Sequence, residues 1–146
     1  MASQLSLVDT GVLVAAAVRS EPQHDQVVAA LQSTAGIRLV PSPVIVEAIF
    51  LIRRARGSEA AARWLRCLLA ADSGLAILEP EIQDLSRAAE LMDEYVDASL
   101  DLVDAVIVAL AERMRINRIL TLDQRDFRLV RPRHCDAFDI LPHGLS

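Results

Sequence analysis

The stretch LSLVDTGVLVAAAV, residues 5–18, is apolar along most of its length, yet it contains a carboxylate, Asp9. Residues 5–9 form a short run rich in Leu and Val, which is typical of a buried β-strand. The Thr-Gly pair that follows breaks this run, and the residues beyond it predict a helix. The stretch therefore predicts a strand with an acid at its carboxyl end, where no polar neighbour accounts for it.

The rest of the chain repeats this order of strand and helix. Short apolar runs predict strands at residues 5–9, 37–43, 75–80, 116–123 and 137–142. Further helices are predicted at residues 21–34, 44–57, 58–72, 81–97 and 101–114. Ser42 is expected as the N-cap of one helix and Pro43 as its first residue. Strands joined through helices predict an α/β fold, with a mainly parallel sheet of five strands (about four to six) flanked by helices on both faces.

The composition is typical of a compact aliphatic globule. Of the 146 residues, 53% are hydrophobic, and five glycines and six prolines are too few for a collagen-like or mucin-like chain. The sequence contains no internal repeat and no linker rich in Pro, Gly or Ser. Residues 1–146 are therefore expected to form a single domain.

The charged residues exclude several classes of function. The net charge of −5 argues against a basic protein that coats nucleic acid irrespective of sequence. Every positive side chain is arginine, and the chain contains no lysine. P-loop proteins and Schiff-base enzymes each need a lysine, as do the receiver domains of response regulators, so none of these classes fits.

The sequence carries no signal for export or membrane insertion. No Lys or Arg precedes the apolar run at residues 12–18, as a signal peptide requires, and no apolar stretch approaches the roughly 18 residues that span a bilayer. Cys67 and Cys135 belong to no recognisable disulfide or metal motif. We therefore expect a soluble cytoplasmic protein with reduced cysteines and no membrane association.

Four acids differ from the others because their neighbours are apolar. They are Asp9, Glu47, Asp104 and Asp123. The first and last end predicted strands, and the other two interrupt helices that are otherwise apolar nearly all round and are expected to be buried on two sides. By contrast, the acids of residues 81–97 alternate with apolar residues at helical spacing, which predicts a solvent-exposed face without function.

The predicted sheet brings these four acids to one edge. The ligand crevice of an open parallel sheet lies outside the carboxyl ends of its strands, where Asp9 and Asp123 are expected. Glu47 and Asp104 lie in the first turns of their helices and project near the same edge. Because buried carboxylates repel one another unless a hard cation lies among them, we predict a site for one or two Mg²⁺ or Mn²⁺ ions. The corresponding chemistry is hydrolysis of a phosphodiester by a metal-activated water.

Four segments, in order, resemble the PIN-domain ribonucleases and, among them, the VapC-type toxins of toxin–antitoxin pairs. They are LVDTGVLVAAA, PSPVIVEAIFLIRRARG, LDLVDAVIVALAERM and ILTLDQRDFRLVRP. The similarity extends over residues 5–132 and includes a His-containing helix in EPQHDQVVAAL. It implies a single PIN domain with Mg²⁺-dependent endoribonuclease activity on RNA. It also implies a homodimer and a cognate antitoxin resembling VapB.

The resemblance implies a role for each acid. The catalytic residues would be Asp9, Glu47, Asp104 and Asp123. Among them Glu47 would bind the metal directly or through water, and the other three directly. Asp101 is either the N-cap of its helix or a further acid of the metal site. Asp126 is either a surface or loop-capping acid or an outer acid of the same site.

Residues near this quartet have expected supporting roles. Thr10 and Thr121 would orient ligands or water through hydrogen bonds, and Arg125 and Arg128 would contact RNA phosphates. Family members often have Ser or Asn two positions after the first Asp. This chain has Gly11 there, so one side-chain hydrogen bond is expected to be missing.

Two other functions remain open. One is a different metal-dependent phosphohydrolase, such as a haloacid-dehalogenase-like enzyme, although that family uses a second Asp where this chain has Gly11, together with a basic residue that is usually Lys. The other is a catalytically inactive PIN-like scaffold or RNA-binding subunit. Such a subunit has no need of four carboxylates that repel one another.

Overall fold

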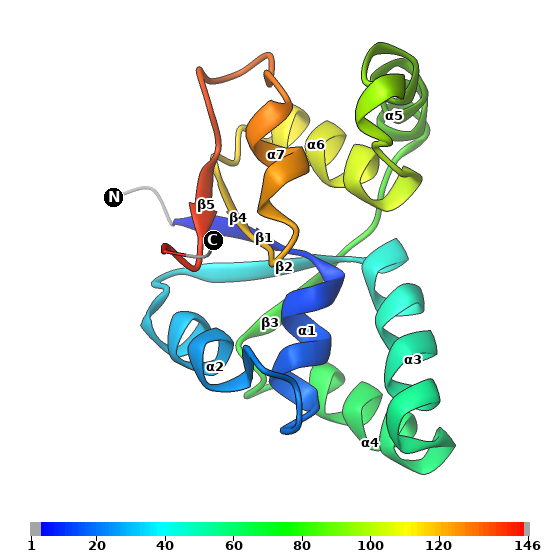
Figure 1. Cartoon of the computed structure of the whole chain (residues 1–146), viewed down its shortest axis with the longest axis vertical. Helices are drawn as coiled ribbons and strands as arrows, with labels where there is room; N and C mark the ends of the chain where they lie inside the picture. Colours follow the sequence, from blue (N-terminus) through cyan, green and yellow to red (C-terminus); the bar gives the residue numbers. More distant parts are fainter. Residues whose placement is uncertain (1–3, 145–146) are drawn as a thin grey trace.

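The computed structural model describes residues 4–144, with a parallel sheet of five strands in the order β3-β2-β1-β4-β5 at its centre (Figure 1). The strands are β1 (Leu5–Val8), β2 (Ile37–Pro41), β3 (Leu75–Leu78), β4 (Arg118–Leu120) and β5 (Asp139–Leu141). The helices are α1 (Thr10–Ala17), α2 (His24–Ser33), α3 (Ser42–Arg56), α4 (Ser58–Leu69), α5 (Ile82–Glu94), α6 (Leu102–Met114) and α7 (Gln124–Leu129). A 3₁₀ turn, η1 (Val96–Ala98), lies between α5 and α6. The predicted parallel α/β sheet is confirmed.

Helices cover both faces of the sheet, as predicted. α1 to α4 connect β1 to β2 and β2 to β3 on one face, and α5 to α7 lie on the other face (Figure 1). β2 and β4 are both hydrogen-bonded to β1, so the connections diverge to opposite faces beside β1. In an open parallel sheet, this divergence opens a crevice outside the carboxyl ends of the strands. Here that position corresponds to the carboxyl ends of β1 and β4.

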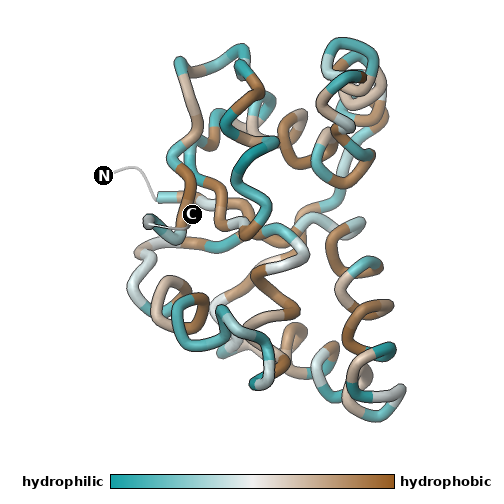
Figure 2. Tube along the Cα trace, viewed as in Figure 1, coloured by the Kyte–Doolittle hydropathy of each residue, from teal (hydrophilic) through white to brown (hydrophobic). Residues whose placement is uncertain are grey.

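The core is centred on β1 and α6. Leu7 and Val8 of β1 are fully buried, and every residue of α6 from Asp104 to Ala111 is buried. Burial on both sides of the sheet accounts for strands that are apolar without alternation. Figure 2 shows hydrophobic residues along the central strands, with hydrophilic residues toward the outer turns. The expectation that the Asp104 helix is buried on two sides is therefore confirmed.

The same expectation for the helix that carries Glu47 is wrong. α3 is buried through Val44, Ala48 and Ile52, which share one face. Val46 and Phe50 on the other face are 72% and 61% exposed. Apolar character all round did not imply burial all round, because among residues 4–144 only the side of α3 that carries Val44, Ala48 and Ile52 is covered.

The acids of α5 are not all solvent-exposed, contrary to the prediction for residues 81–97. Asp84 is only 2% exposed. Its carboxylate accepts hydrogen bonds from Nε of Arg113 at 2.9 Å and from the backbone N–H of Glu81 at 2.8 Å. Asp84 thus caps its own helix and pairs with α6, which gives it a structural role.

The start of α3 and the presence of α7 differ from the sequence prediction. Ser42 is the first residue of α3, so Pro41 occupies the N-cap position and Pro43 lies one residue inside. The Ser42 hydroxyl instead donates to Oε2 of Glu79 at 2.7 Å. α7 was not predicted, because six residues are too few to display a helical period.

Cys67 and Cys135 are free thiols. Among the helices of residues 4–144, none combines the length and apolar character needed to cross a membrane.

Candidate metal centre

The ends of two adjacent strands supply two of the predicted acids. Asp9 follows β1 and Asp123 follows β4 by three residues, and the two strands pair with Val8 opposite Leu120. The backbone N–H of Asp9 extends this pairing by donating to the carbonyl of Leu120 at 2.9 Å. The sheet therefore fixes the position of Asp9 at its carboxyl edge, as the sequence predicts.

Asp9 is buried, and each of its carboxylate oxygens has a donor. Oδ1 accepts from the backbone N–H of Thr10 at 2.7 Å, and Oδ2 accepts from the hydroxyl of Thr121 at 2.8 Å. Burial raises the pKa of Asp9 to about 6, and the charges of Glu47 and Asp101 add to this rise, whereas the two hydrogen bonds oppose it. The carboxylate is thus held in one orientation, and burial destabilises its charged form.

Asp104 is the most strongly perturbed acid of the site. It lies in the first turn of α6, where its backbone N–H donates to Oδ1 of Asp101 at 2.9 Å. The pKa of Asp104 is raised to about 8. Burial is the largest cause, and the nearby charges of Asp9, Asp101 and Asp123 raise the pKa further. Asp101 thus takes the N-cap position, one of its two predicted alternatives.

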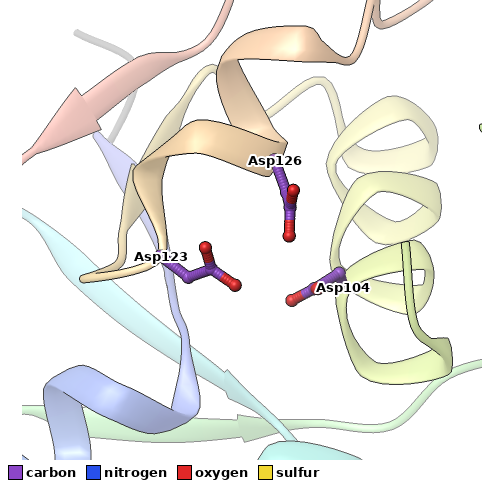
Figure 3. A group of neighbouring side chains, drawn as sticks. All are labelled: Asp104, Asp123 and Asp126. Carbon is purple, nitrogen blue, oxygen red and sulfur yellow. The ribbon is translucent and has the colours of Figure 1, made fainter. Parts of the chain in front are cut away.

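Three carboxylates converge in front of these strands. Asp104, Asp123 and Asp126 each place an oxygen within 4.8 Å of the other two, and Figure 3 shows their carboxylates pointing toward one another from α6 and from the start of α7. The pKa of Asp123 is raised by burial and then by the charge of Asp126. Within residues 4–144, no arginine forms an ion pair with any of the three. An all-oxygen donor set without a balancing cation suits a hard divalent metal ion.

The cluster differs in membership from the predicted metal ligands. Asp126, left open in the sequence analysis, belongs to it, whereas Asp9 and Glu47 lie outside this closest group. Both still act on the site, because the charge of Asp9 raises the pKa of Asp104 and that of Glu47 raises the pKa of Asp9. The assignment of individual metal ligands stays a prediction.

The two threonines contact Asp9 in different ways. Thr121 uses its hydroxyl, which also accepts a hydrogen bond from the backbone N–H of Asp123 at 3.1 Å. Thr10 uses its backbone N–H, and its buried hydroxyl has no hydrogen-bond partner among residues 4–144. Both threonines therefore hydrogen-bond Asp9, Thr121 through its side chain and Thr10 through its backbone.

Gln124 was missed by the sequence analysis. Its buried amide donates to the carbonyls of Thr121 at 3.1 Å and Pro142 at 2.8 Å, and it accepts from Nη2 of Arg128 at 2.8 Å. Gln124 thereby links the loop after β4 to the residue that follows β5. The spacing of Gln124 and Phe127, three apart on the buried side of α7, is the signal that could have identified it.

The two arginines predicted to bind RNA lie beside this loop. Arg125 and Arg128 are both exposed, and Arg128 donates to the side chain of Gln124. Their contact with RNA stays a prediction.

Comparison with known proteins identifies relatives over almost the whole chain. The family model for the PIN domain matches residues 6–131. Ribonuclease VapC26 of Mycobacterium tuberculosis is 31% identical over 136 residues, which are 93% of this chain and 99% of that protein.

Solved structures of several toxins share the fold. The structure of Mycobacterium tuberculosis VapC20, a toxin that cleaves the sarcin-ricin loop, has a TM-score of 0.76 at 18% identity and covers 83% of this chain and 92% of its own. VapBC2 of Rickettsia felis, bound to a DNA fragment from its promoter, has a TM-score of 0.68 at 15% identity, with 95% and 100% covered. At these identities the structures support the fold alone.

Proposed function

The chain belongs to the PIN-domain family, and from this premise we propose that it is a Mg²⁺-dependent endoribonuclease that acts as the toxin of a toxin–antitoxin pair. The observation that carries the proposal is the convergence of Asp104, Asp123 and Asp126 beside Asp9 at the edge where β1 and β4 end. The name of the relative Ribonuclease VapC26, at 31% identity, supports RNA as the substrate.

The carboxylates of the cluster would hold the ion. Asp104, Asp123 and Asp126 would bind one or two Mg²⁺ or Mn²⁺ ions, and Asp9 and Glu47 would bind directly or through water. A bound divalent ion supplies Lewis-acid stabilisation for the charge that develops on a phosphodiester and lowers the pKa of water. The oxygen-only donor set and the raised pKa values of Asp9 and Asp104 fit this ion, since its charge would offset the repulsion among the acids.

The protein groups around the ion would orient the acids. Thr121 and the backbone of Thr10 hold both oxygens of Asp9, so its carboxylate needs no rearrangement when substrate arrives. Asp101, as the N-cap, fixes the first turn of α6 and with it Asp104. Such preorganisation is the main contribution that a protein makes to hydrolysis at a metal centre.

The partners follow from the same proposal. Structures with this fold include a toxin–antitoxin complex from Klebsiella pneumoniae and the DNA-bound VapBC complex of Salmonella typhimurium. We propose a VapB-like antitoxin as the inhibitor of this chain and a homodimer as its assembly. We also propose that the protein acts in the cytoplasm, where RNA and such an antitoxin would be available to it.

Induced expression in a bacterial host tests the proposed toxicity. The unmodified chain is expected to arrest growth, and Asp9→Ala is expected to restore it. Asp93→Ala, which removes an exposed acid of α5, is the matched control and is expected to remain toxic. Growth arrest by Asp9→Ala at the same expression level would contradict the proposal.

A further inference from the structure

A groove lies between α5, α6 and the segment that follows α7, on the face of the sheet that these helices cover (Figure 1). Its volume is about 610 Å³, which is within the range of ligand pockets. The ion pairs of Asp84 with Arg113 and of Arg87 with Glu112 hold the start of α5 beside the end of α6. This α5–α6 groove is therefore at the end of α6 opposite Asp104, outside the metal centre.

The residues that line the groove carry one more positive charge than negative charge. They include four arginines and three acids, namely Arg87, Arg113, Arg115, Arg133, Asp84, Glu90 and Glu112. Arg115 takes part in no ion pair among residues 4–144. Arg133 meets only Glu90, at 3.4 Å and with both side chains largely exposed, and such a surface pair contributes little. Arg115 and Arg133 are therefore available to an anion.

The segment that follows α7 is held against the groove by two backbone hydrogen bonds. The N–H of Arg131 donates to the hydroxyl of Tyr95, at the end of α5, at 2.9 Å. The N–H of Arg133 donates to Oε2 of Glu112, near the end of α6, at 2.9 Å. Side chains of α5 and α6 thus fix the backbone of this segment, so that less conformational freedom is lost when its arginines bind a ligand.

Exposed arginines continue from the metal centre to the groove. Residues 113–133 contain seven arginines and two acids, and both acids belong to the carboxylate cluster. Arg128 lies in α7 beside this cluster, and Arg131 and Arg133 follow it in the segment that leads to the groove. All three are exposed. Since the whole chain has a net charge of −5, this local series of positive charges favours a polyanion that extends from the acids to the groove.

The length of α6 sets how far such a polyanion must extend. Asp104 and Arg115 are eleven residues apart along α6, which corresponds to a rise of about 16 Å. At roughly 3.4 Å for each stacked nucleotide, this is the rise of about five nucleotides. An RNA at the acids therefore reaches the groove only when about five nucleotides lie on one side of the bond that is cut.

We propose that the α5–α6 groove is a second phosphate-binding site for the RNA, in which Arg115 and Arg133 bind backbone phosphates about five nucleotides from the bond that is cut. The site rests on the proposed ribonuclease function and adds a minimum length of RNA for tight binding. A protein partner is a poorer occupant, because charged residues are depleted at the centre of protein interfaces, whereas seven of them line this groove.

Binding of RNAs of two lengths, without cleavage, tests the groove. In the Asp104→Asn background with EDTA, fluorescence anisotropy gives the affinity for labelled RNAs of three and twelve nucleotides at several salt concentrations. For the longer RNA, Arg115→Gln and Arg133→Gln should each lower the slope of log K against log[salt] by about 0.7, the contribution of one phosphate contact. This corresponds to binding that is about fivefold weaker at 0.1 M salt. The shorter RNA should bind both variants like the parent.

Two control variants accompany these measurements. Arg63→Gln removes an exposed arginine of α4 on the other face of the sheet and should leave both affinities unchanged. Arg133→Lys keeps the charge and should retain the salt slope. Equal weakening on both RNAs, or parental affinity of both groove variants for the longer RNA, would overturn the proposal. A rise in Tm with inorganic phosphate that Arg115→Gln abolishes, without an effect on the longer RNA, would assign the groove to a small anion instead.

Cleavage of the longer RNA with Mg²⁺ keeps the two proposals apart. If the unmodified chain cleaves it while Arg115→Gln and Arg133→Gln cleave with unchanged KM, the groove proposal is wrong and the ribonuclease proposal stands. If the variants raise KM and leave kcat unchanged, the groove proposal is supported. If the unmodified chain neither binds nor cleaves RNA, both proposals fail.

Discussion

The hydroxyl of Thr121 donates a 2.8 Å hydrogen bond to Oδ2 of Asp9, and so joins the loops that follow β4 and β1. Both residues are buried, and Thr121 also accepts from the backbone N–H of Asp123. One hydroxyl therefore positions an acid from each strand. The geometry of the candidate metal centre depends on this contact between two distant parts of the sequence.

Replacing Thr121 with Val should weaken metal binding while the fold is retained. The substitution keeps the shape of the side chain but leaves Oδ2 of Asp9 without its donor, which raises the pKa of Asp9 further. We expect the affinity for Mn²⁺ to fall about 10–100-fold in calorimetric titration. Thr121→Ser should restore most of it, and an unchanged affinity in Thr121→Val would show that the hydroxyl does not position Asp9.

Gln124→Leu should lower both stability and metal affinity. The variant leaves the carbonyls of Thr121 and Pro142 without their donor and disconnects the loop after β4 from the end of the sheet. We expect a loss of about 1–3 kcal/mol in the free energy of unfolding, measured with urea. Gln26→Leu, at an exposed position of α2, is the control. Equal stability of the two variants would refute the role of Gln124.

The acids predict an unusual dependence of stability on pH. The pKa values of Asp9 and Asp104 rise from 3.8 to about 6 and about 8 in the folded protein, so the fold binds protons more tightly than the unfolded chain. The resulting stabilisation is complete below pH 4 and is lost as the pH rises through 6 and then 8. In EDTA, the Tm of the unmodified chain should therefore fall between pH 5 and pH 8.5 relative to the Tm of Asp104→Asn measured at the same pH.

Mg²⁺ should reverse this trend. The ion binds the deprotonated carboxylates, so its effect on Tm should be larger at pH 8.5 than at pH 5.5. Differential scanning fluorimetry with and without Mg²⁺ measures the difference. A rise in Tm that is the same at both pH values, or that persists in Asp104→Asn, would place the ion elsewhere.

Gly11→Ala should stabilise the protein. Gly11 is the second residue of α1, and a Cβ built there lies 3.5 Å from Cβ of Leu122, an ordinary contact. Glycine costs roughly 0.5–1 kcal/mol relative to alanine within a helix. We expect a gain of up to this size in urea unfolding. A loss of stability would indicate that the backbone must move at this position.

The sequence predicted the features that depend on neighbouring residues. Asp9 was recognised because a carboxylate in an apolar strand has no local explanation, and its strand and the parallel sheet followed from the same pattern. The buried state of Asp84 depends on Arg113, 29 residues away, and could not be read from the helical period of α5. On α3 the prediction failed in the opposite direction, because apolar residues expected to be buried are exposed. The sequence shows that a residue is hydrophobic but not whether another element covers it.

In the candidate site, too, the sequence predicted residues that have a local signal and missed those whose role depends on tertiary contacts. Asp104 and Asp123 were selected by their apolar surroundings and meet in the cluster, whereas Asp126 lies in a polar segment where an acid has many explanations. Gln124 acts through the carbonyls of Thr121 and Pro142, and contact with Pro142 requires that β5 lie beside β4. Tertiary contacts of this kind have no signal in local composition.

Cleavage of a labelled RNA by the purified chain, freed of any antitoxin, tests the central claim most directly. We predict endonucleolytic products with Mg²⁺, none with EDTA, and none from folded Asp104→Asn with Mg²⁺, whereas Asp93→Asn cleaves like the unmodified chain. Equal cleavage in EDTA, or full activity of Asp104→Asn, would contradict the assignment of the carboxylate cluster as a metal-dependent ribonuclease centre.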